Sequence, residues 1–428
     1  MKKVYLLLTL VFALVLSACG NSGETSGNAN NEGGGDGASS SGDTSTVKLY
    51  APFSGPDGEN MKQIVEDYNG SQEDVQVDLQ IVPQNDYYTT LDLTLSGGGE
   101  GDQPDLVVMH GDQIQTYVEN GSLQEAAPLL EGDISADDYH EKALIGTEHE
   151  DTLYGIPFDI HPLMYFWNKD LIQEAGYDAE YIPSNRDEFI EMTTAVSELG
   201  DDKHGFVVPT LWPQQFIFPT LVYQNGGELI TDGEVNYTEE PVVDAAQFLY
   251  DLIYTHEVSP SNVQQDGELT LFMQGNNAVT FNGPWMMNQF EESGINYGVA
   301  PVPQLGTEQQ AVFANSHNFV LPASVEDETK IESIRNFLGY VAENSMEWAE
   351  SGQAPAAKAV YESEEFQDME FQSQVASQFD DVKFAPEVSN WGPVSDPLFQ
   401  NLNEILLDEK EIEAALQDAE EASQANLE

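Results

Sequence analysis

From residue 47 onward the chain alternates between short apolar runs and longer segments with helical spacing, and this alternation restricts the fold more than any other feature. Residues 47–50 form a strand-type run, a loop with glycine and proline follows, and the apolar residues of 61–68 have helical spacing. The cycle continues with strands expected at 75–82 and 105–109 and a helix expected between them at 87–95. Alternating strands and helices predict an α/β fold in which helices cover the sheets.

The remainder of the chain continues in the same way. Further strands are expected at 153–157, 163–167, 278–281, 297–301 and 318–321, and further helices at 186–199, 242–254, 268–273, 329–341 and from Asp396 to the C-terminus. The folded part has roughly 380 residues, which exceeds what one hydrophobic core usually serves, so two lobes are predicted.

The charge of the chain is strongly negative. Acidic residues outnumber basic ones by 76 to 13, which gives a formal net charge of −63. Such a field repels nucleic acids and anionic membrane surfaces and argues against both as partners. An acidic, lysine-poor surface is typical of proteins from salty or alkaline surroundings, where salt screens the self-repulsion. Solubility alone is the other explanation.

The first residues have the layout of a secretory signal. Lys2 and Lys3 precede a short apolar run at 4–16, and small residues follow it. The run is shorter than the roughly 20 residues that a bilayer requires, so 1–19 is interpreted as a cleaved signal peptide and not as a membrane helix.

Cys19 is the only cysteine of the chain, and the residues before it, Leu16, Ser17 and Ala18, resemble a bacterial lipoprotein signal. A thiol at a new N-terminus can carry acyl chains such as palmitate, each giving about 0.8 kcal/mol of membrane affinity per buried methylene. Lipidation at Cys19 would place the protein on the extracellular face of the cytoplasmic membrane. The alternative is an ordinary secretory peptide with an incidental cysteine. A single cysteine excludes disulfides and cysteine-rich metal sites.

Residues 20–46 consist mostly of Gly, Ser, Asn and Asp. This composition cannot bury enough apolar surface to offset the entropy lost on ordering, so a disordered tether is predicted.

Several segments, in order, resemble the extracellular solute-binding proteins of carbohydrate ABC importers, a family (family 1) that includes the maltose-binding type. The matching segments are 47–69, 103–108, 153–158, 164–170, 224–228, 272–285 and 318–322. Each is weakly specific alone, but together with the lipoprotein start they cover nearly the whole mature chain.

The resemblance implies a two-lobed periplasmic-binding-protein fold with a ligand cleft and a hinge of two or three strands. By analogy, the first lobe holds 47–158 and 312–350, and the second holds 162–308 and 360–428. The implied function is that of a monomeric extracellular sugar-binding lipoprotein, which closes on a carbohydrate and delivers it to the permease subunits of an ABC transporter. It would be neither an enzyme nor a carrier of a cofactor, and it would touch the membrane only through its lipid anchor.

A sugar ring has apolar faces and a rim of hydroxyls, so aromatic plates and polar side chains are expected to converge on it. Trp285 follows a strand in the sequence Asn-Gly-Pro-Trp, where the family often places a stacking tryptophan. Trp212 and Trp391 lie in loops rich in glycine and proline, and Phe53 lies in the first loop between strand and helix. Loops carry binding residues more often than core residues. For each aromatic the alternative is a packing role.

Polar candidates lie at strand ends and at the two expected hinge crossings. They are His110, Asp112, Asp159, His161, Asn282 and His317. His110 and Asp112 follow a strand at its carboxyl end, where open α/β sheets bind ligands. The sequence distances between the histidines fit no familiar metal-ligand spacing, so sugar hydroxyls are preferred to a metal ion as their partners.

Two other functional classes compete with sugar binding. A secreted glycosidase requires two carboxylates flanking a bond, and counting 76 acidic residues cannot reject such a pair. A binding protein for a polyamine, iron, a peptide or phosphate is the stronger rival. The row of candidate aromatics favours a di- or oligosaccharide over a monosaccharide, whereas the identity of the sugar does not follow from the sequence.

Overall fold

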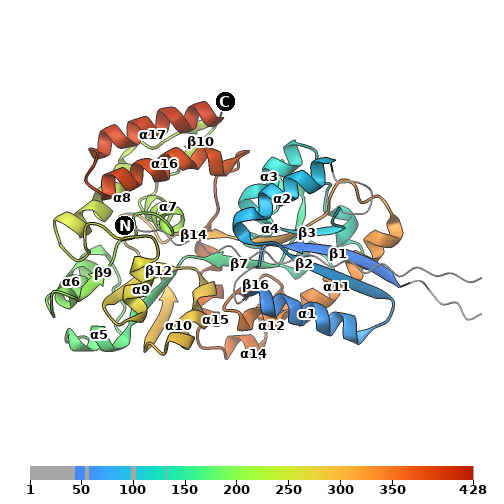
Figure 1. Cartoon of the computed structure of the whole chain (residues 1–428), viewed down its shortest axis with the longest axis horizontal. Coiled ribbons are helices and arrows are strands. Elements are labelled where there is room, and N and C mark those ends of the chain that lie inside the picture. Colours follow the sequence, from blue (N-terminus) through green and yellow to red (C-terminus); the bar gives the residue numbers. More distant parts are fainter. Residues whose placement is uncertain (1–43, 54–56, 98–102, 133, 428) are drawn as a thin grey trace, which may run out of the picture. The chain divides into compact units, whose positions relative to one another are not determined.

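The structure, a computed structural model, describes residues 44–53, 57–97, 103–132 and 134–427 (Figure 1). The expected signal peptide, the lipidation site at Cys19 and most of the tether lie outside the described residues. Strand β1 (Ser45–Ala51) includes Ser45 and Thr46, so the tether that the sequence extends to residue 46 ends before this strand. No helix among the described residues is long and apolar enough to cross a membrane.

The first sheet has five strands in the order β2–β1–β3–β15–β6. Strands β2 (Val75–Ile81) and β3 (Leu106–His110) run parallel to β1. Strand β15 (His317–Val320) runs antiparallel to both β3 and β6 (Gly155–Pro157). The sheet therefore combines an early parallel unit with two strands from later in the chain.

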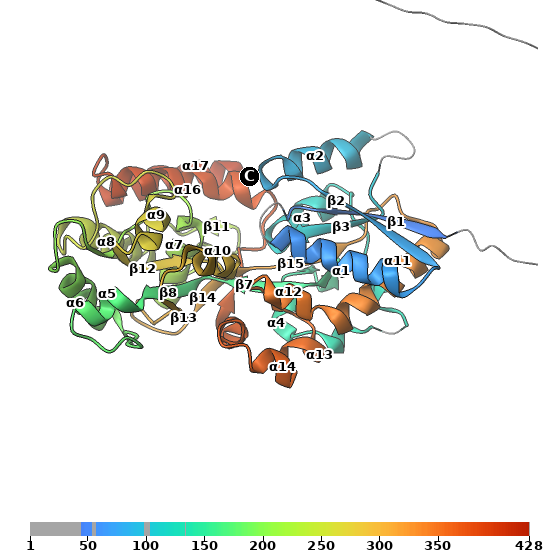
Figure 2. The ribbon, with the colours of Figure 1, turned by 60° about the horizontal axis from the view of Figure 1, so that its bottom comes forward.

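Helices cover both faces of this sheet, with α1 (Asp57–Ser71) and α11 (Glu328–Asn344) on one face and α2 (Gln84–Gly97) and α3 (Gly111–Glu119) on the other (Figure 2). Successive residues of a strand point to opposite faces. In β3, Leu106 and Val108 accordingly join the large core beneath α1 and α11. Val107 and Met109 join the smaller core beneath α2 and α3.

The second sheet has four strands in the order β13–β8–β12–β9. Their bounds are β8 (Met164–Asn168), β9 (His204–Phe206), β12 (Asn277–Asn282) and β13 (Tyr297–Pro301). Its helices are α5 (Lys169–Glu174), α6 (Arg186–Ser197), α7 (Gln214–Gln224), α8 (Glu240–Tyr254), α9 (Gly267–Met273) and α10 (Met287–Ser293). Every residue of β8 and β12 is buried, as expected for strands that are covered on both faces.

Two C-terminal helices, α16 (Trp391–Leu406) and α17 (Ile412–Leu427), lie side by side and pack on α8 (Figure 1). The sequence predicted that the helical C-terminal part begins at Asp396. Helix α16 begins five residues earlier, so Trp391 lies in its first turn and not in a loop.

A third sheet, in the order β16–β7–β14–β17, contains the two hinge crossings. Strand β7 (Asp159–Pro162) follows β6 of the first sheet and leads to β8 of the second. Strand β14 (Val312–Asn315) follows β13 of the second sheet and leads back to β15 of the first. The outer strands are β16 (Ala354–Pro355) and β17 (Val382–Lys383). The sequence placed hinge crossings at these two points, and the fold is the expected two-lobed one.

The lobe boundaries themselves remain a prediction. Strand β14 pairs with the hinge strands β7 and β17, whereas the sequence assigned residues from 312 onward to the first lobe. Helix α13 (Lys358–Tyr361) packs on α11 of the first lobe, although the sequence begins the second lobe's last segment at residue 360. The remaining short elements include α4 (Glu141–Ile145), β4 (Glu148–His149), β5 (Thr152–Leu153), β10 (Ile230–Thr231), β11 (Glu234–Val235), α12 (Met346–Glu350), α14 (Glu364–Gln367) and α15 (Gln372–Ala376).

One carboxyl group in the second lobe is buried with an oxygen atom that has no hydrogen-bond partner among the described residues. Glu268 on α9 is 2% exposed, and its Oε1 atom has no hydrogen-bond partner among the described residues. Burial raises the pKa of Glu268 to about 7, and the nearby Asp266 acts in the same direction. The folded state therefore holds this proton more tightly than the unfolded chain does.

We predict that Glu268→Gln stabilises the protein only at higher pH. Because the folded pKa lies above the unfolded value, ionisation of Glu268 removes stability as the pH rises from about 4.5 to about 7. At pH 8 the variant should exceed the parent by roughly 1 to 3 kcal/mol in denaturant unfolding, and at about pH 4, below the unfolded pKa, the two should agree. Glu292→Gln, at an exposed position on α10, is the matched control. An equal gain at both pH values would contradict the assignment.

Candidate functional site

The carboxylate of Asp159 organises the floor of the site. Its Oδ1 atom lies 2.9 Å from Nδ1 of His161 and accepts the backbone N–H of His317 at 3.0 Å. Its Oδ2 atom lies 2.7 Å from Nδ1 of His317 and accepts the indole N–H of Trp348 at 2.8 Å. One side chain on β7 thereby holds groups on β7, β15 and α12.

The four donors keep Asp159 ionised. Burial alone disfavours its charge, but the attraction of His317 and His161 and their hydrogen bonds outweigh burial and hold the pKa of Asp159 well below its usual range. An ionised carboxylate can only accept hydrogen bonds, so Nδ1 of both histidines carries a proton. Burial also lowers the pKa of His161, and the neighbouring His317 lowers it further. In the neutral ring, Nε2 is then a free acceptor.

Strand register brings the three candidate histidines together. His110 at the end of β3 lies directly opposite His317 at the start of β15, and their ring centroids are 4.7 Å apart. In the hinge sheet His161 lies opposite Asn315, two residues before His317, and the rings of His161 and His317 are 4.4 Å apart. One nitrogen from each of the three rings lies within 4.8 Å of the others. The sequence distances gave no sign of this convergence.

Tyr88 on α2 positions His110. Its hydroxyl lies 2.6 Å from Nδ1 of His110 and accepts the backbone N–H of the same residue at 3.1 Å. Burial, and then the neighbouring His317 and His161, hold the pKa of His110 well below its ordinary value. The helical spacing of residues 87–95 carries no sign that Tyr88 has a partner on β3.

Trp285 lies in a short 3₁₀ helix, Pro284–Met286, directly after β12, and its ring centroid is 5.7 Å from that of His161. The indole folds back over Gly283. A Cβ atom at residue 283 would lie 2.0 Å from the six-membered ring of Trp285. Glycine is therefore required at this position, which gives the Asn-Gly-Pro-Trp sequence a structural reason.

A second indole lies beside Trp285. Trp212 lies 6.3 Å from it, centroid to centroid, with an angle of 29° between the ring planes. Both tryptophans are half-buried. Phe216, buried on α7, contacts both with its ring edge-on, at 5.6 and 5.9 Å, and supports them from below. The sequence gives no sign that Phe216 has a special position, because buried residues occupy all faces of α7.

Phe53 lies beneath the histidines. It is 2% exposed, and its ring meets that of His317 edge-on at 4.8 Å and that of Trp348 at 4.7 Å. Trp348 on α12 is fully buried but donates a hydrogen bond to Asp159. Both aromatics therefore fix polar groups of the site from behind.

Asp112 lies apart from the aromatic pair. It lines a cavity of about 330 Å³ that is bounded by α3, by α4, by Tyr223 on α7 and by residues 382–388. Burial raises the pKa of Asp112, against hydrogen bonds from Asn315 and Gln113 that act in the opposite direction. Its Oδ1 atom is buried without a hydrogen-bond partner among the described residues.

Two further candidates lie in buried surroundings. Asn282 is the last residue of β12, and its Oδ1 accepts the N–H of Gly283 at 2.8 Å, whereas its Nδ2 has no partner among the described residues. Trp391 is 6% exposed and packs into the large core at the start of α16. The residue before it, Asn390, donates its backbone N–H to Oγ1 of Thr116 on α3 at 2.8 Å.

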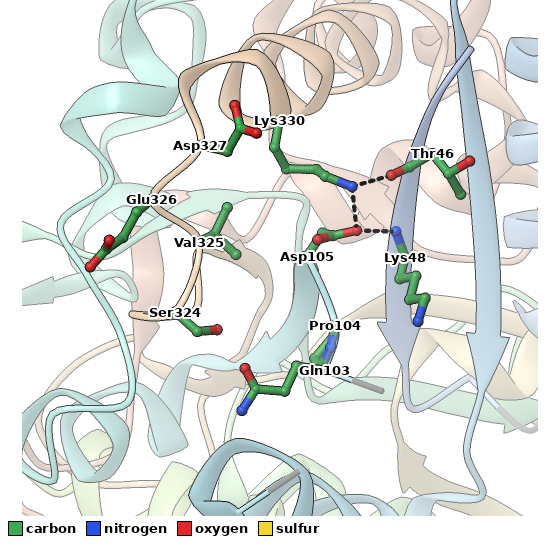
Figure 3. A pocket seen from close by; sticks show the side chains of 10 residues that line it. All are labelled: Thr46, Lys48, Gln103, Pro104, Asp105, Ser324, Val325, Glu326, Asp327 and Lys330. Carbon is green, nitrogen blue, oxygen red and sulfur yellow. Dashed lines mark hydrogen bonds and ion pairs between the residues drawn. The ribbon is translucent and has the colours of Figure 1, made fainter. Parts of the chain in front are cut away.

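A larger cavity, of about 470 Å³, lies between β1 and the start of α11, and none of the candidate residues lines it (Figure 3). There Asp105 accepts hydrogen bonds from the backbone of Lys48 and from Nζ of Lys330, which also bonds to the carbonyl of Thr46. These bonds connect α11 to the first sheet. We therefore assign this cavity a structural role and place the site at the hinge.

The chain is similar to known binding proteins. The chain is 25% identical to the galactooligosaccharide-binding protein of Bacillus subtilis over 276 residues, which cover 61% of this chain and 62% of that protein. It is also 25% identical to a maltooligosaccharide ABC transporter solute-binding lipoprotein of Streptococcus pneumoniae over 335 residues, which cover 74% and 75% of the two chains.

Among solved structures, the cyclic alpha-maltosyl-1,6-maltose binding protein from Arthrobacter globiformis has the same fold. It superposes with a TM-score of 0.77 at 22% identity, over 90% of this chain and 99% of that chain. Residues 63–372 match the model of a protein family, described as bacterial extracellular solute-binding proteins. This match covers most of the chain, which therefore belongs to the bacterial extracellular solute-binding proteins.

Proposed function

We propose that the protein binds a di- or oligosaccharide in the cleft between its lobes and delivers it to an ABC importer. The observation that carries the proposal is the pair of half-buried indoles, Trp212 and Trp285, beside the histidines of the hinge. Relatives named for galacto- and maltooligosaccharides support the choice of ligand.

The chemistry of these residues suits a sugar. The indoles offer apolar faces to the C–H faces of pyranose rings. Near them, Nε2 of His161 and of His110 is available to hydroxyl groups, and the unpartnered Nδ2 of Asn282 can gain a hydrogen bond from a ligand. Oδ1 of Asp112, in the separate cavity, can contact a longer chain of rings. Asp159 orients His161 and His317 through hydrogen bonds, and Phe53 packs against the ring of His317. In this proposal His317 is a further partner of the sugar.

Closure of the cleft is the proposed mechanism. A sugar that touches both lobes stabilises the closed form, because only that form offers both sets of contacts. The hydrogen bond between Asn390 and Thr116 links the start of α16, which packs on α8, to α3 on the first sheet. In this proposal the bond forms in the closed state, and Trp391 anchors the loop that provides it.

We further propose that the protein acts as a monomer, performs no chemistry on the sugar and delivers it to membrane permease subunits. The lipoprotein-type sequence around Cys19 and the lipoprotein name of the pneumococcal relative support a lipid anchor on the extracellular face of the cytoplasmic membrane.

A first prediction concerns Trp285. Purified protein should gain thermal stability with one oligosaccharide series, by about 2.7 kcal/mol when the ligand is at about 100 times its dissociation constant. Trp285→Ala should weaken binding of that sugar by at least about tenfold in calorimetry, because a stacking surface near the centre of the site is lost. Gly283→Ala should act in the same direction by displacing the indole.

Tyr340→Ala is the control for loss of an aromatic ring, because Tyr340 lies on α11 and packs on Tyr68 of α1, away from the hinge. If a polyamine, a metal chelate or a peptide stabilises the protein and no sugar does, the proposed ligand is wrong. The family assignment would be unchanged. Unaltered sugar affinity in Trp285→Ala would remove this tryptophan from the site.

A second prediction concerns the contact between α3 and α16. Thr116→Val removes the acceptor of the Asn390 N–H, so the closed form loses one hydrogen bond of about 1 kcal/mol. Sugar affinity should fall roughly fivefold in calorimetry. Thr255→Val, which removes a local bond to Asp251, should leave the affinity unchanged. If the two variants bind equally well, the contact has no part in closure.

A third prediction concerns the anchor. Cys19→Ser removes the acyl acceptor, so the expressed protein should move from the membrane fraction to the medium and lose labelling by an alkyne-bearing fatty acid. Retention of the label in the variant would show that another residue carries the lipid.

A further inference from the structure

The histidines of the hinge, which the carbohydrate proposal uses as separate partners of sugar hydroxyls, also form a cluster. His110, His161 and His317 are the one group of three or more His, Cys, Asp or Glu residues, among those the structure describes, whose ligand atoms converge. Their nitrogen atoms lie within 4.8 Å of one another. Three ring nitrogens this close are a typical donor set for a metal ion.

We propose that His110, His161 and His317 bind one divalent transition-metal ion of the class that prefers imidazole, for which zinc is the probe. Imidazole nitrogen suits zinc, copper, nickel and cobalt, whereas calcium and magnesium prefer oxygen. Three histidines leave one position of a tetrahedral ion open. This inference goes beyond sugar binding and does not depend on it.

The surroundings of the rings are an independent observation in favour of a metal. A histidine that binds a metal through one nitrogen usually has its other nitrogen hydrogen-bonded to a carboxylate or a similar group, which fixes the orientation of the ring. Asp159 does this for Nδ1 of His161 and of His317, and the hydroxyl of Tyr88 bonds to Nδ1 of His110. The nitrogen that remains for a ligand in each ring is Nε2.

The three rings have to move before they can bind one ion. Nitrogen ligands of a tetrahedral zinc ion lie about 3.3 Å apart. This is closer than the 4.8 Å within which one nitrogen of each ring lies from the others, so the rings have to bring their Nε2 atoms together. The backbone already holds the rings in place, because His110 and His317 are direct partners across β3 and β15.

Charge also favours a cation here. Asp159 holds a negative charge in contact with two of the rings, and the chain as a whole carries a formal charge of −63. The same acidic surface attracts metal ions weakly and without a defined site. The experiment therefore has to separate one ordered site from general attraction.

The test uses chelator-treated protein in high salt, titrated with zinc in calorimetry and with cobalt in visible absorption. One equivalent of zinc should bind, and cobalt should give the intense visible bands of a four-coordinate ion with nitrogen ligands. His110→Gln should weaken zinc binding at least about 100-fold, because a direct ligand is lost. This residue is half-buried, so its replacement disturbs the core less than replacement of His317.

His256→Gln, outside the cluster, is the matched control and should bind zinc as the parent does. If circular dichroism shows that His110→Gln is misfolded, His161→Gln repeats the test. Weak binding of several equivalents that neither variant changes, or cobalt with only the faint bands of a six-coordinate ion, would overturn the proposal. Trp285→Ala should lose sugar affinity and keep zinc affinity, so failure of the metal proposal is distinguishable from failure of the carbohydrate proposal.

Discussion

The buried carboxylate of Asp159 is the interaction on which the site depends. It accepts hydrogen bonds from His161, from Trp348 and twice from His317, on three different elements. An ionised group this deeply buried is tolerated only when its lone pairs are occupied, and here the donors meet that requirement. The consequence for function is orientation, because the carboxylate fixes which nitrogen of His161 and of His317 faces a ligand. Asp159 does so at the hinge. Strand β7 leads from the first sheet to the second, and β15 begins where the chain returns to the first sheet.

The second half of the site comes from the other lobe and rests on packing. Trp285 lies against Gly283 and on the ring of Phe216, with Trp212 alongside. The close approach of the Gly283 backbone and the buried ring of Phe216 leave the Trp285 indole few alternative positions. Less conformational entropy is therefore lost when a ligand stacks on this indole. Polar groups ordered by a carboxylate on one side and aromatic plates ordered by packing on the other give the two lobes complementary roles. A ligand that needs both then favours closure.

Much of the fold was predictable from the sequence, because its strands and helices keep clear apolar periods. The crossings at Asp159 and near His317 followed from the resemblance to the family and from the prolines around them. Helix α7 was not predicted, because its apolar residues are not confined to one face of the helix. The start of α16 at Trp391 was not predicted, because glycine and proline in the first turn are more typical of a loop. The candidate list contained the histidines, but their convergence depends on the register of β3 with β15 and of β7 with β14. Register is set by pairing between residues 152 or more positions apart, which the local apolar periods do not encode.

The most direct test of this account is the protonation state of His161 and His317 in protein free of metal and sugar. Nitrogen-15 labelling of histidine, with long-range proton–nitrogen correlation spectra at neutral pH, distinguishes the two neutral forms of each ring from the charged one. Both rings should carry a proton on Nδ1, His161 should be neutral with a free Nε2, and Asp159→Asn should disturb the pattern in both rings. A proton on Nε2 with a bare Nδ1 in either ring of the parent protein would contradict the role given to Asp159.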